Sequence, residues 1–225
     1  MMNNTRRSTA IFHIFAVLML AVLFAGCAST TQSNMSNMSN MNSGQTQSSS
    51  NSQGTDLGKV AAPNFQLKDQ HNIPIALTQF KGKPLILTFF YTHCQTSCPL
   101  IAEKIHSTLL DLGKNSQQVG IVAISADPTG DTPASVATFS QEHQLQGYKN
   151  WHYLLGTRQQ LSPIWASYHV DGVPPHATMM SAGNMAHSSV VYVIDQQGHE
   201  RTLFDSDFQP NQLAQNIQTL LTNKS

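Results

Sequence analysis

Two long apolar runs with a helical pattern between them restrict the fold of this 225-residue chain more than any other feature. Pro84 to Thr92 is almost continuously apolar, and Val119 to Ala126 is a second such run. Runs of this kind are typical of central parallel strands that are covered on both faces. Between the two runs, apolar residues recur at helical spacing, at Ile101, Ile105, Leu109 and Leu112. The sequence therefore predicts a strand, a helix and a second strand in an α/β protein.

The segments around this unit predict further strands and helices. Asn72 is expected in the turn of an N-terminal hairpin because Asn tolerates the left-handed conformation. Pro133 is expected near the start of a helix that ends by Gly147. The other expected elements are a strand at Trp151 to Leu155, a helix capped by Thr157, a hairpin of Val190 to Asp195 with Arg201 to Phe204, and a closing helix that contains Leu213, Ile217 and Leu220. This order predicts a thioredoxin-like α/β sandwich with an N-terminal β-hairpin extension.

Residues 1–27 are interpreted as a signal segment. Arg6 and Arg7 precede an apolar run from Ile11 to Ala25, which is shorter than the roughly 20 residues that span a bilayer comfortably. The run ends at Cys27 in a sequence that resembles a bacterial lipobox, which predicts lipidation of Cys27. An uncleaved signal anchor is the alternative. Either interpretation tethers the chain to a membrane at the extracytoplasmic, periplasmic face of the cell envelope, where thiols tend to be oxidised.

Residues 28–57 are predicted to be a disordered tether, and residues 58–225 a folded domain. No charged residue occurs from Ala28 to Thr55, where Ser, Asn, Gln and Met dominate. Such a segment cannot bury enough apolar surface to fold. Met35, Met38 and Met41 recur at every third position. Their thioethers suit Cu(I), so a weak copper-collecting tether is one interpretation, but repeat expansion in an unselected linker is the favoured one.

Composition excludes one class of partner and leaves two cysteines to explain. Twelve basic and twelve acidic residues give no net charge, so there is no basic excess to bind nucleic acid. Of the three cysteines, Cys27 is assigned to lipid, which leaves Cys94 and Cys98 for the folded domain.

Cys94 and Cys98 form a CxxxC motif between the first apolar run and the following helix. A helix N-terminus lowers the pKa of a thiol, and residues four apart lie on one face once the segment is helical. Two sulfurs placed in this way suit a soft metal ion or a reversible disulfide in the oxidised form. A structural disulfide or a pair of inert thiols is the plain alternative. These arguments leave the choice between metal and redox chemistry open.

Several motifs resemble the SCO/SenC family of copper chaperones, in order and at suitable separations. They are Phe65-Gln66-Leu67-Lys68-Asp69, Lys81-Gly82-Lys83-Pro84, Phe90-Tyr91-Thr92-His93-Cys94 with Cys98-Pro99, Ala126-Asp127-Pro128 with Asp131-Thr132-Pro133, and His187-Ser188 before Tyr192-Val193-Ile194-Asp195. The resemblance implies one bound copper, with Cys94, Cys98 and His187 as its ligands. It also implies delivery of copper to a copper enzyme, such as the CuA site in subunit II of cytochrome c oxidase.

Two positions depart from the family pattern near the site. Gln95-Thr96 stands where Pro-Asp is usual, and Ala186 stands where an aspartate usually precedes the histidine. The segment before His187 also contains residues that could act as auxiliary copper ligands or as a hydrophobic flap, namely His176, Met179, Met180 and Met185. Turn formation and helix capping are sufficient to explain Asp127 and Asp131.

The favoured function is a membrane-tethered copper chaperone. The alternative is a thiol-disulfide oxidoreductase that acts on partner cysteines. A Cys94–Cys98 disulfide would block metal binding, so a thiol reductant is an expected partner in either case. A third hypothesis, a structural lipoprotein with bridged cysteines, gives His187 no role. Of the other histidines, His93 is interpreted as pointing away from Cys94, and His152 as solvated.

Overall fold

The structure is a computed structural model that describes residues 54–173 and 189–223. Its strands are β1 (Thr55–Ala61), β2 (Gln66–Asp69), β3 (Pro74–Ala76), β4 (Leu85–Phe90), β5 (Gly120–Ser125), β6 (Trp151–Leu155), β7 (Val191–Ile194) and β8 (His199–Phe204). Its helices are α1 (Ser97–Leu112), α2 (Pro133–Glu142), α3 (Arg158–Ser167) and α5 (Pro210–Thr222), with 3-10 turns η1 (Leu77–Phe80) and η2 (Gly113–Gln118). Among the helices of these two ranges, none combines the length and apolar character that a bilayer crossing requires.

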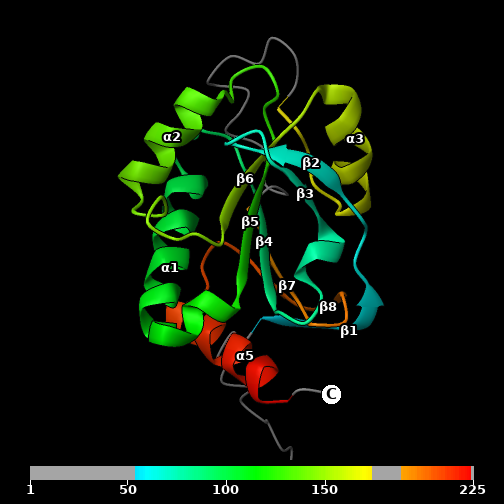
Figure 1. The fold of residues 1–225 in the computed structure, drawn as a ribbon, viewed down its shortest axis with the longest axis vertical. Helices are drawn as coiled ribbons and strands as arrows, with labels where there is room; N and C mark the ends of the chain where they lie inside the picture. Colours follow the sequence, from blue (N-terminus) through cyan, green and yellow to red (C-terminus); the bar gives the residue numbers. More distant parts are fainter. Residues whose placement is uncertain (1–53, 174–188, 224–225) are drawn as a thin grey trace, which may run out of the picture. The chain divides into compact units, whose positions relative to one another are not determined.

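The strands form one mixed sheet in the order β1-β8-β7-β4-β5-β6-β2-β3 (Figure 1). β4 pairs with β5 and β5 with β6 in parallel, whereas β7 is antiparallel to β4. The outer pairs β7 with β8, β1 with β8, β2 with β6 and β2 with β3 are also antiparallel. The prediction of a thioredoxin-like α/β fold with an N-terminal hairpin is therefore confirmed.

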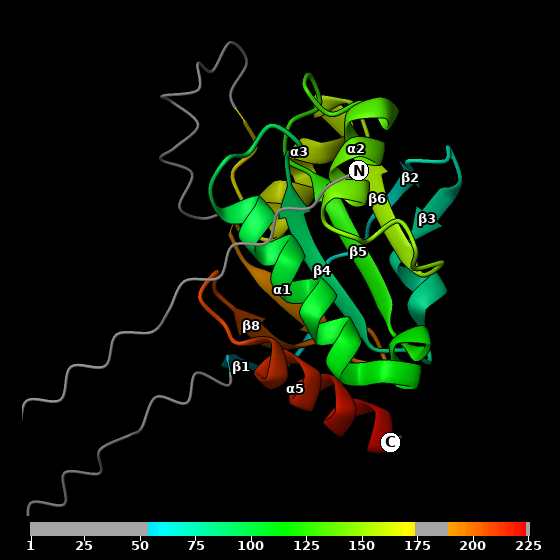
Figure 2. The same cartoon turned by 90° about the vertical axis from the view of Figure 1, so that its left-hand side faces the viewer.

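Helices cover both faces of the sheet, which explains why its central strands are apolar throughout. Successive side chains of a strand point to opposite faces. Ile86 and Phe90 of β4 therefore pack in a cluster with residues of α1, α2 and α5, and Leu87 and Phe89 in a second cluster with residues of α3. α1 and α5 lie side by side on one face of the sheet (Figure 2). Each fully buried Leu, Ile or Phe contributes roughly 1.5–3 kcal/mol to folding.

Most of the local signals in the sequence have the expected structural effect. Asn72 has φ 63° in the β2–β3 hairpin, and Gly113 has φ 54° at the end of α1. Thr132 and Thr157 cap α2 and α3, each by accepting the backbone N–H of the residue three positions on. Thr is one of the residue types preferred at helix N-caps, so both caps agree with the expectation from sequence.

Two details differ from the sequence-based expectation. α2 ends at Glu142 rather than near Gly147, because Gln144 takes the left-handed conformation, with φ 56°, directly after the helix. β1 begins at Thr55, within the last three residues of the segment predicted to be the tether. β1 lies at the edge of the sheet and is almost entirely exposed, so it has no alternating apolar pattern by which it could be found.

The sheet topology brings four chain segments to one edge. β4, β5 and β6 are parallel, so their C-terminal ends share an edge, and antiparallel β7 begins there. The register shows this directly, since Thr88 near the end of β4 pairs with Val191 at the start of β7. The CxxxC motif follows β4 and therefore lies at this edge.

Candidate metal centre

Cys94 and Cys98 are brought together by a turn and the start of α1. The Cys94 N–H donates to the carbonyl of Tyr91 at 3.1 Å, and α1 begins at Ser97. Cys94 thus precedes the helix, and the expectation that both cysteines lie on one helical face is wrong in that detail. Both side chains are nevertheless buried, with exposed fractions of 6% and 3%, and both are free thiols.

The sulfur of Cys94 caps the N-terminus of α1. The Cys98 N–H donates to Cys94 Sγ at 3.3 Å, whereas the side chain of Thr96, the residue before the helix, makes no capping bond. The hydroxyl oxygens of Thr96 and Ser97 lie 3.8 Å and 3.9 Å from the same sulfur. A helix N-terminus with unsatisfied N–H groups favours a negative charge at this position.

The two thiols have very different acidities. A hydrogen bond from the Cys98 thiol lowers the pKa of Cys94 to about 4, although burial acts in the opposite direction. The N–H groups of Thr96 and Cys98 and the hydroxyl of Tyr91 also stabilise the Cys94 thiolate. The same interaction with Cys94, together with burial, raises the pKa of Cys98. The reduced pair therefore holds one thiolate and one thiol at neutral pH, ready to bind a soft cation or attack a disulfide.

A buried carboxylate, Asp131, lies beneath the start of the CxxxC loop. It accepts the Thr92 N–H at 2.7 Å, the Ser125 hydroxyl at 2.6 Å and the Tyr153 hydroxyl at 2.8 Å. Burial raises the pKa of Asp131 despite these donors. The interpretation of Asp131 as a turn or capping residue is incomplete, because the cap of α2 is Thr132. The sequence does not show that Asp131 accepts hydrogen bonds from three separate segments, because these segments meet only in the folded sheet.

Both ends of the segment 174–188 are held at the same edge as the cysteines. On one side, the Val173 N–H donates to the carbonyl of Ala126, which follows β5, at 2.7 Å. On the other side, the Ser189 hydroxyl donates to the Ser97 hydroxyl at 2.7 Å. The carbonyl of Val190 also accepts the Thr88 hydroxyl at 2.8 Å. The chain thus leaves the described structure next to Ala126 and rejoins it beside the CxxxC motif.

Of the site residues predicted from sequence, the structure describes Cys94 and Cys98. The others lie outside the described residues: Cys27, His176, Met179, Met180, Met185 and His187. Within residues 54–173 and 189–223, no group of three or more Cys, His, Asp or Glu side chains is arranged to hold a metal ion. Within these ranges, Cys94 and Cys98 are two neighbouring sulfur groups that could bind a soft metal ion.

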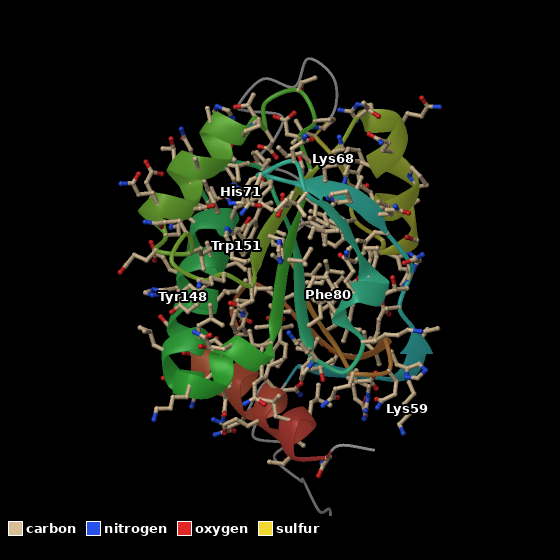
Figure 3. All side chains as sticks on the ribbon, in the orientation of Figure 1. Lys59, Lys68, His71, Phe80, Tyr148 and Trp151 are labelled. Carbon is tan, nitrogen blue, oxygen red and sulfur yellow. The ribbon has the colours of Figure 1, made fainter. Side chains whose placement is uncertain are left out.

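His152 differs from its interpretation as a solvated residue. Its Nδ1 lies 3.0 Å from the carboxylate of Asp69, and its ring contacts Phe80 edge-on. It borders a hollow of about 560 Å³ between the β2–β3 turn and α2. His71, Tyr148 and Trp151 also line this hollow, and Figure 3 shows them between the hairpin and the helices. Neither cysteine lines it.

Comparison with known proteins assigns the chain to a family. The family model described as SCO1/SenC matches residues 53–222. The SCO1 protein homolog of Bacillus subtilis is 27% identical over 95 residues, which are 42% of this chain and 49% of that protein. The match thus spans about half the length of that relative. The chloroplastic peroxiredoxin Q of Populus jackii is 28% identical over 167 residues, which are 72% of this chain and 68% of that protein.

A solved structure shows the same likeness in three dimensions. Bradyrhizobium japonicum ScoI with copper bound superimposes with a TM-score of 0.59 at 27% sequence identity, and the match covers 72% of this chain and 99% of that structure. The family model spans nearly all of the described structure, including the CxxxC motif and the strands around it. The chain belongs to the SCO1/SenC family.

Proposed function

We propose that this protein is a copper chaperone of the cell envelope. It binds one copper through Cys94, Cys98 and His187 and delivers it to a copper enzyme. The observation that carries the proposal is the pair of free, buried thiols at the edge of the sheet where the chain rejoins at Ser189. Membership of the SCO1/SenC family and the likeness to a copper-bound ScoI support copper as the metal.

The anchoring of Ser189 supports His187 as the third ligand. The Ser189 hydroxyl is bonded to Ser97, the residue next to Cys98. His187 precedes Ser189 by two residues, so covalent geometry limits the distance between their Cα atoms to about 7 Å. This limit keeps the His187 backbone in the neighbourhood of Ser97 and the CxxxC motif, which supports His187 as the proposed third ligand.

The proposed ligands suit copper in transit. Two thiolates and one imidazole are acceptable to both Cu(I) and Cu(II). A set of three leaves one side of the ion open to a partner. Because Cys98 is protonated in the reduced pair, uptake of copper releases a proton at this thiol, whereas Cys94 is already ionised. His176, Met179, Met180 and Met185 are proposed as auxiliary ligands.

The proposal includes a location and partners. Residues 1–27 direct the chain out of the cytoplasm, and a lipid on Cys27 holds it at the membrane, with residues 28–57 as the tether. The copper recipient is proposed to be the CuA site in subunit II of cytochrome c oxidase. A thiol reductant keeps Cys94 and Cys98 free to bind the metal.

Titration of the reduced full-length chain against a competing Cu(I) chelator tests this function. We expect one tightly bound Cu(I) per chain. Replacement of Cys94, Cys98 or His187 by alanine should weaken binding by more than the roughly 10- to 100-fold that loss of an outer-shell partner costs. His93→Ala is the matched control, because His93 is an exposed histidine next to Cys94. Unchanged affinity in Cys94→Ala, or an equal loss in His93→Ala, contradicts the proposed ligand set.

The low pKa of Cys94 favours a second candidate function, thiol-disulfide exchange. The Cys94 thiolate would attack a partner disulfide, and Cys98 would then displace the partner thiolate to give the Cys94–Cys98 disulfide and a reduced partner. The likeness to peroxiredoxin Q is consistent with thiol chemistry on this fold. Insulin reduction separates the two functions, since a chaperone is expected to turn over far more slowly than thioredoxin.

A further inference from the structure

We infer that Asp131 is a positioning residue for the CxxxC pair: its buried carboxylate fixes the backbone from which the copper-binding loop starts. The inference rests on the proposed copper site and concerns a residue that is not itself a ligand. Asp131 is 8% exposed, and its three donors come from segments that are far apart in the sequence.

The carboxylate connects three parallel strands, near the C-terminal ends of β4 and β5 and at the middle of β6. Its Oδ2 accepts hydroxyl groups from Ser125, the last residue of β5, and from Tyr153 in β6. Its Oδ1 accepts the backbone N–H of Thr92, two residues after β4 and two before Cys94. Ser125 and Tyr153 donate to the same oxygen, so either donor can hold the carboxylate while its other oxygen holds Thr92. Asp131 therefore transmits the rigidity of β5 and β6 to the loop that carries Cys94.

The bond to Thr92 requires a hydrogen-bond acceptor at position 131. A backbone N–H can only donate, whereas the hydroxyl groups of Ser125 and Tyr153 can turn to accept. An amide at position 131 could therefore keep its oxygen on Thr92 and direct its NH₂ group toward the two hydroxyls. An alanine would leave the Thr92 N–H without its acceptor and release the start of the loop.

Asp127, which lies with Asp131 in the loop between β5 and α2, provides a control. Its Oδ1 accepts the N–H and hydroxyl of Thr129 at 3.1 Å and 2.6 Å, so these bonds stay within its own turn. Tyr153→Phe is a second control, because it removes one buried hydrogen bond to Asp131 and leaves the Thr92 contact intact. Both controls disturb the structure near the site without releasing the loop.

Two measurements on the reduced full-length chain test the inference: Cu(I) affinity and hydrogen exchange of the Thr92 amide. Asp131→Ala should weaken Cu(I) binding by about 10- to 100-fold, the usual effect of losing an outer-shell partner. It should also accelerate exchange at Thr92. Asp131→Asn, Asp127→Ala and Tyr153→Phe should all remain within about threefold of the parent in affinity, a difference well below 1.4 kcal/mol.

Each other outcome overturns the inference. An equal loss in Asp131→Asn would assign the effect to charge, and an equal loss in Tyr153→Phe would assign it to general destabilisation. Unchanged affinity in Asp131→Ala would leave Asp131 a purely structural residue. If that variant does not fold, the double variant Asp131→Ala with Tyr153→Phe replaces it, since removing both partners of a buried bond costs less than removing one. A parent chain that binds no copper would refute the proposed function, and Thr92 exchange would still test the geometry.

Discussion

The pH dependence of Cys94 reactivity is the most direct test of the electrostatics at the CxxxC motif. The structure lowers the pKa of this thiol from its ordinary value of 9.0 to about 4. The first cause is the Cys98 thiol, which donates a hydrogen bond to Cys94, and the N-terminal N–H groups of α1 and the Tyr91 hydroxyl add to it. We expect Cys94 to react as a thiolate over the whole range from weakly acidic to alkaline pH.

The size of the effect depends on which quantity is measured. A thiol of pKa 9.0 is only about 1% ionised at pH 7, whereas Cys94 is almost fully ionised, so the thiolate concentration rises by about 100-fold. The intrinsic nucleophilicity of a thiolate falls as its pKa falls, by roughly 100- to 300-fold over this interval. The two factors nearly cancel in the rate at pH 7. The position of the pH profile, rather than the rate at one pH, therefore carries the information.

The assay is the rate of alkylation of the reduced chain by iodoacetamide as a function of pH, with the modified cysteine identified by peptide mapping. Cys94 modification should reach half of its maximum near pH 4 and be constant above about pH 6. Cys98→Ala removes the main donor and should move the midpoint to higher pH. A midpoint near pH 8 or 9 in the parent chain would refute the reasoning, as would an unchanged midpoint in Cys98→Ala.

Three further predictions concern the stability of the domain and the proposed site. Asp69→Asn should destabilise the fold by about 1–3 kcal/mol at pH 7 in urea unfolding. Burial acts to raise the pKa of Asp69, but hydrogen bonds from the Ile73 N–H and His152 outweigh it and lower the pKa. The ionised carboxylate therefore stabilises the fold fully above the unfolded pKa of about 3.9, and this stabilisation is lost as pH falls through the lower folded pKa. If the parent and Asp69→Asn still differed in free energy of unfolding in acid, below the folded pKa, the reasoning would be wrong. Thr132→Ala should cost about 1 kcal/mol through loss of the α2 cap, and Thr132→Ser much less, so equal losses would exclude capping. Ser189→Ala should weaken Cu(I) binding by about two- to tenfold, the value of one net hydrogen bond, and an unaltered affinity would mean that this contact does not position the chain at the site.

Local signals and apolar patterns predict the fold well because they act over short distances. The run from Pro84 to Thr92 must be covered on both faces, and the structure places β4 in the middle of the sheet. Gly113, Asn72 and Thr157 determine backbone geometry by their own chemistry, and each occurs where the sequence predicts. β1 is the exception, because an exposed edge strand is held by backbone hydrogen bonds that leave no pattern in the side chains.

The candidate site is predictable only in part, since most of its interactions join distant segments. The CxxxC spacing identifies Cys94 and Cys98, but the spacing does not show that Cys94 lies in a turn and caps α1. The role of Asp131 depends on Thr92, Ser125 and Tyr153, which converge only in the folded sheet. The assignment of His187 as a ligand comes from a family resemblance and remains a prediction.

The position of β1 has a consequence for how the domain could be released. β1 is the last strand of the sheet, most of it is exposed, and its only strand partner in the described structure is β8. Such a strand can open locally at little cost in free energy, while the strands around the cysteines stay closed. A peptidase that cleaves β1 during this opening would separate the residues before the cut from a domain that keeps β4, β5 and both cysteines.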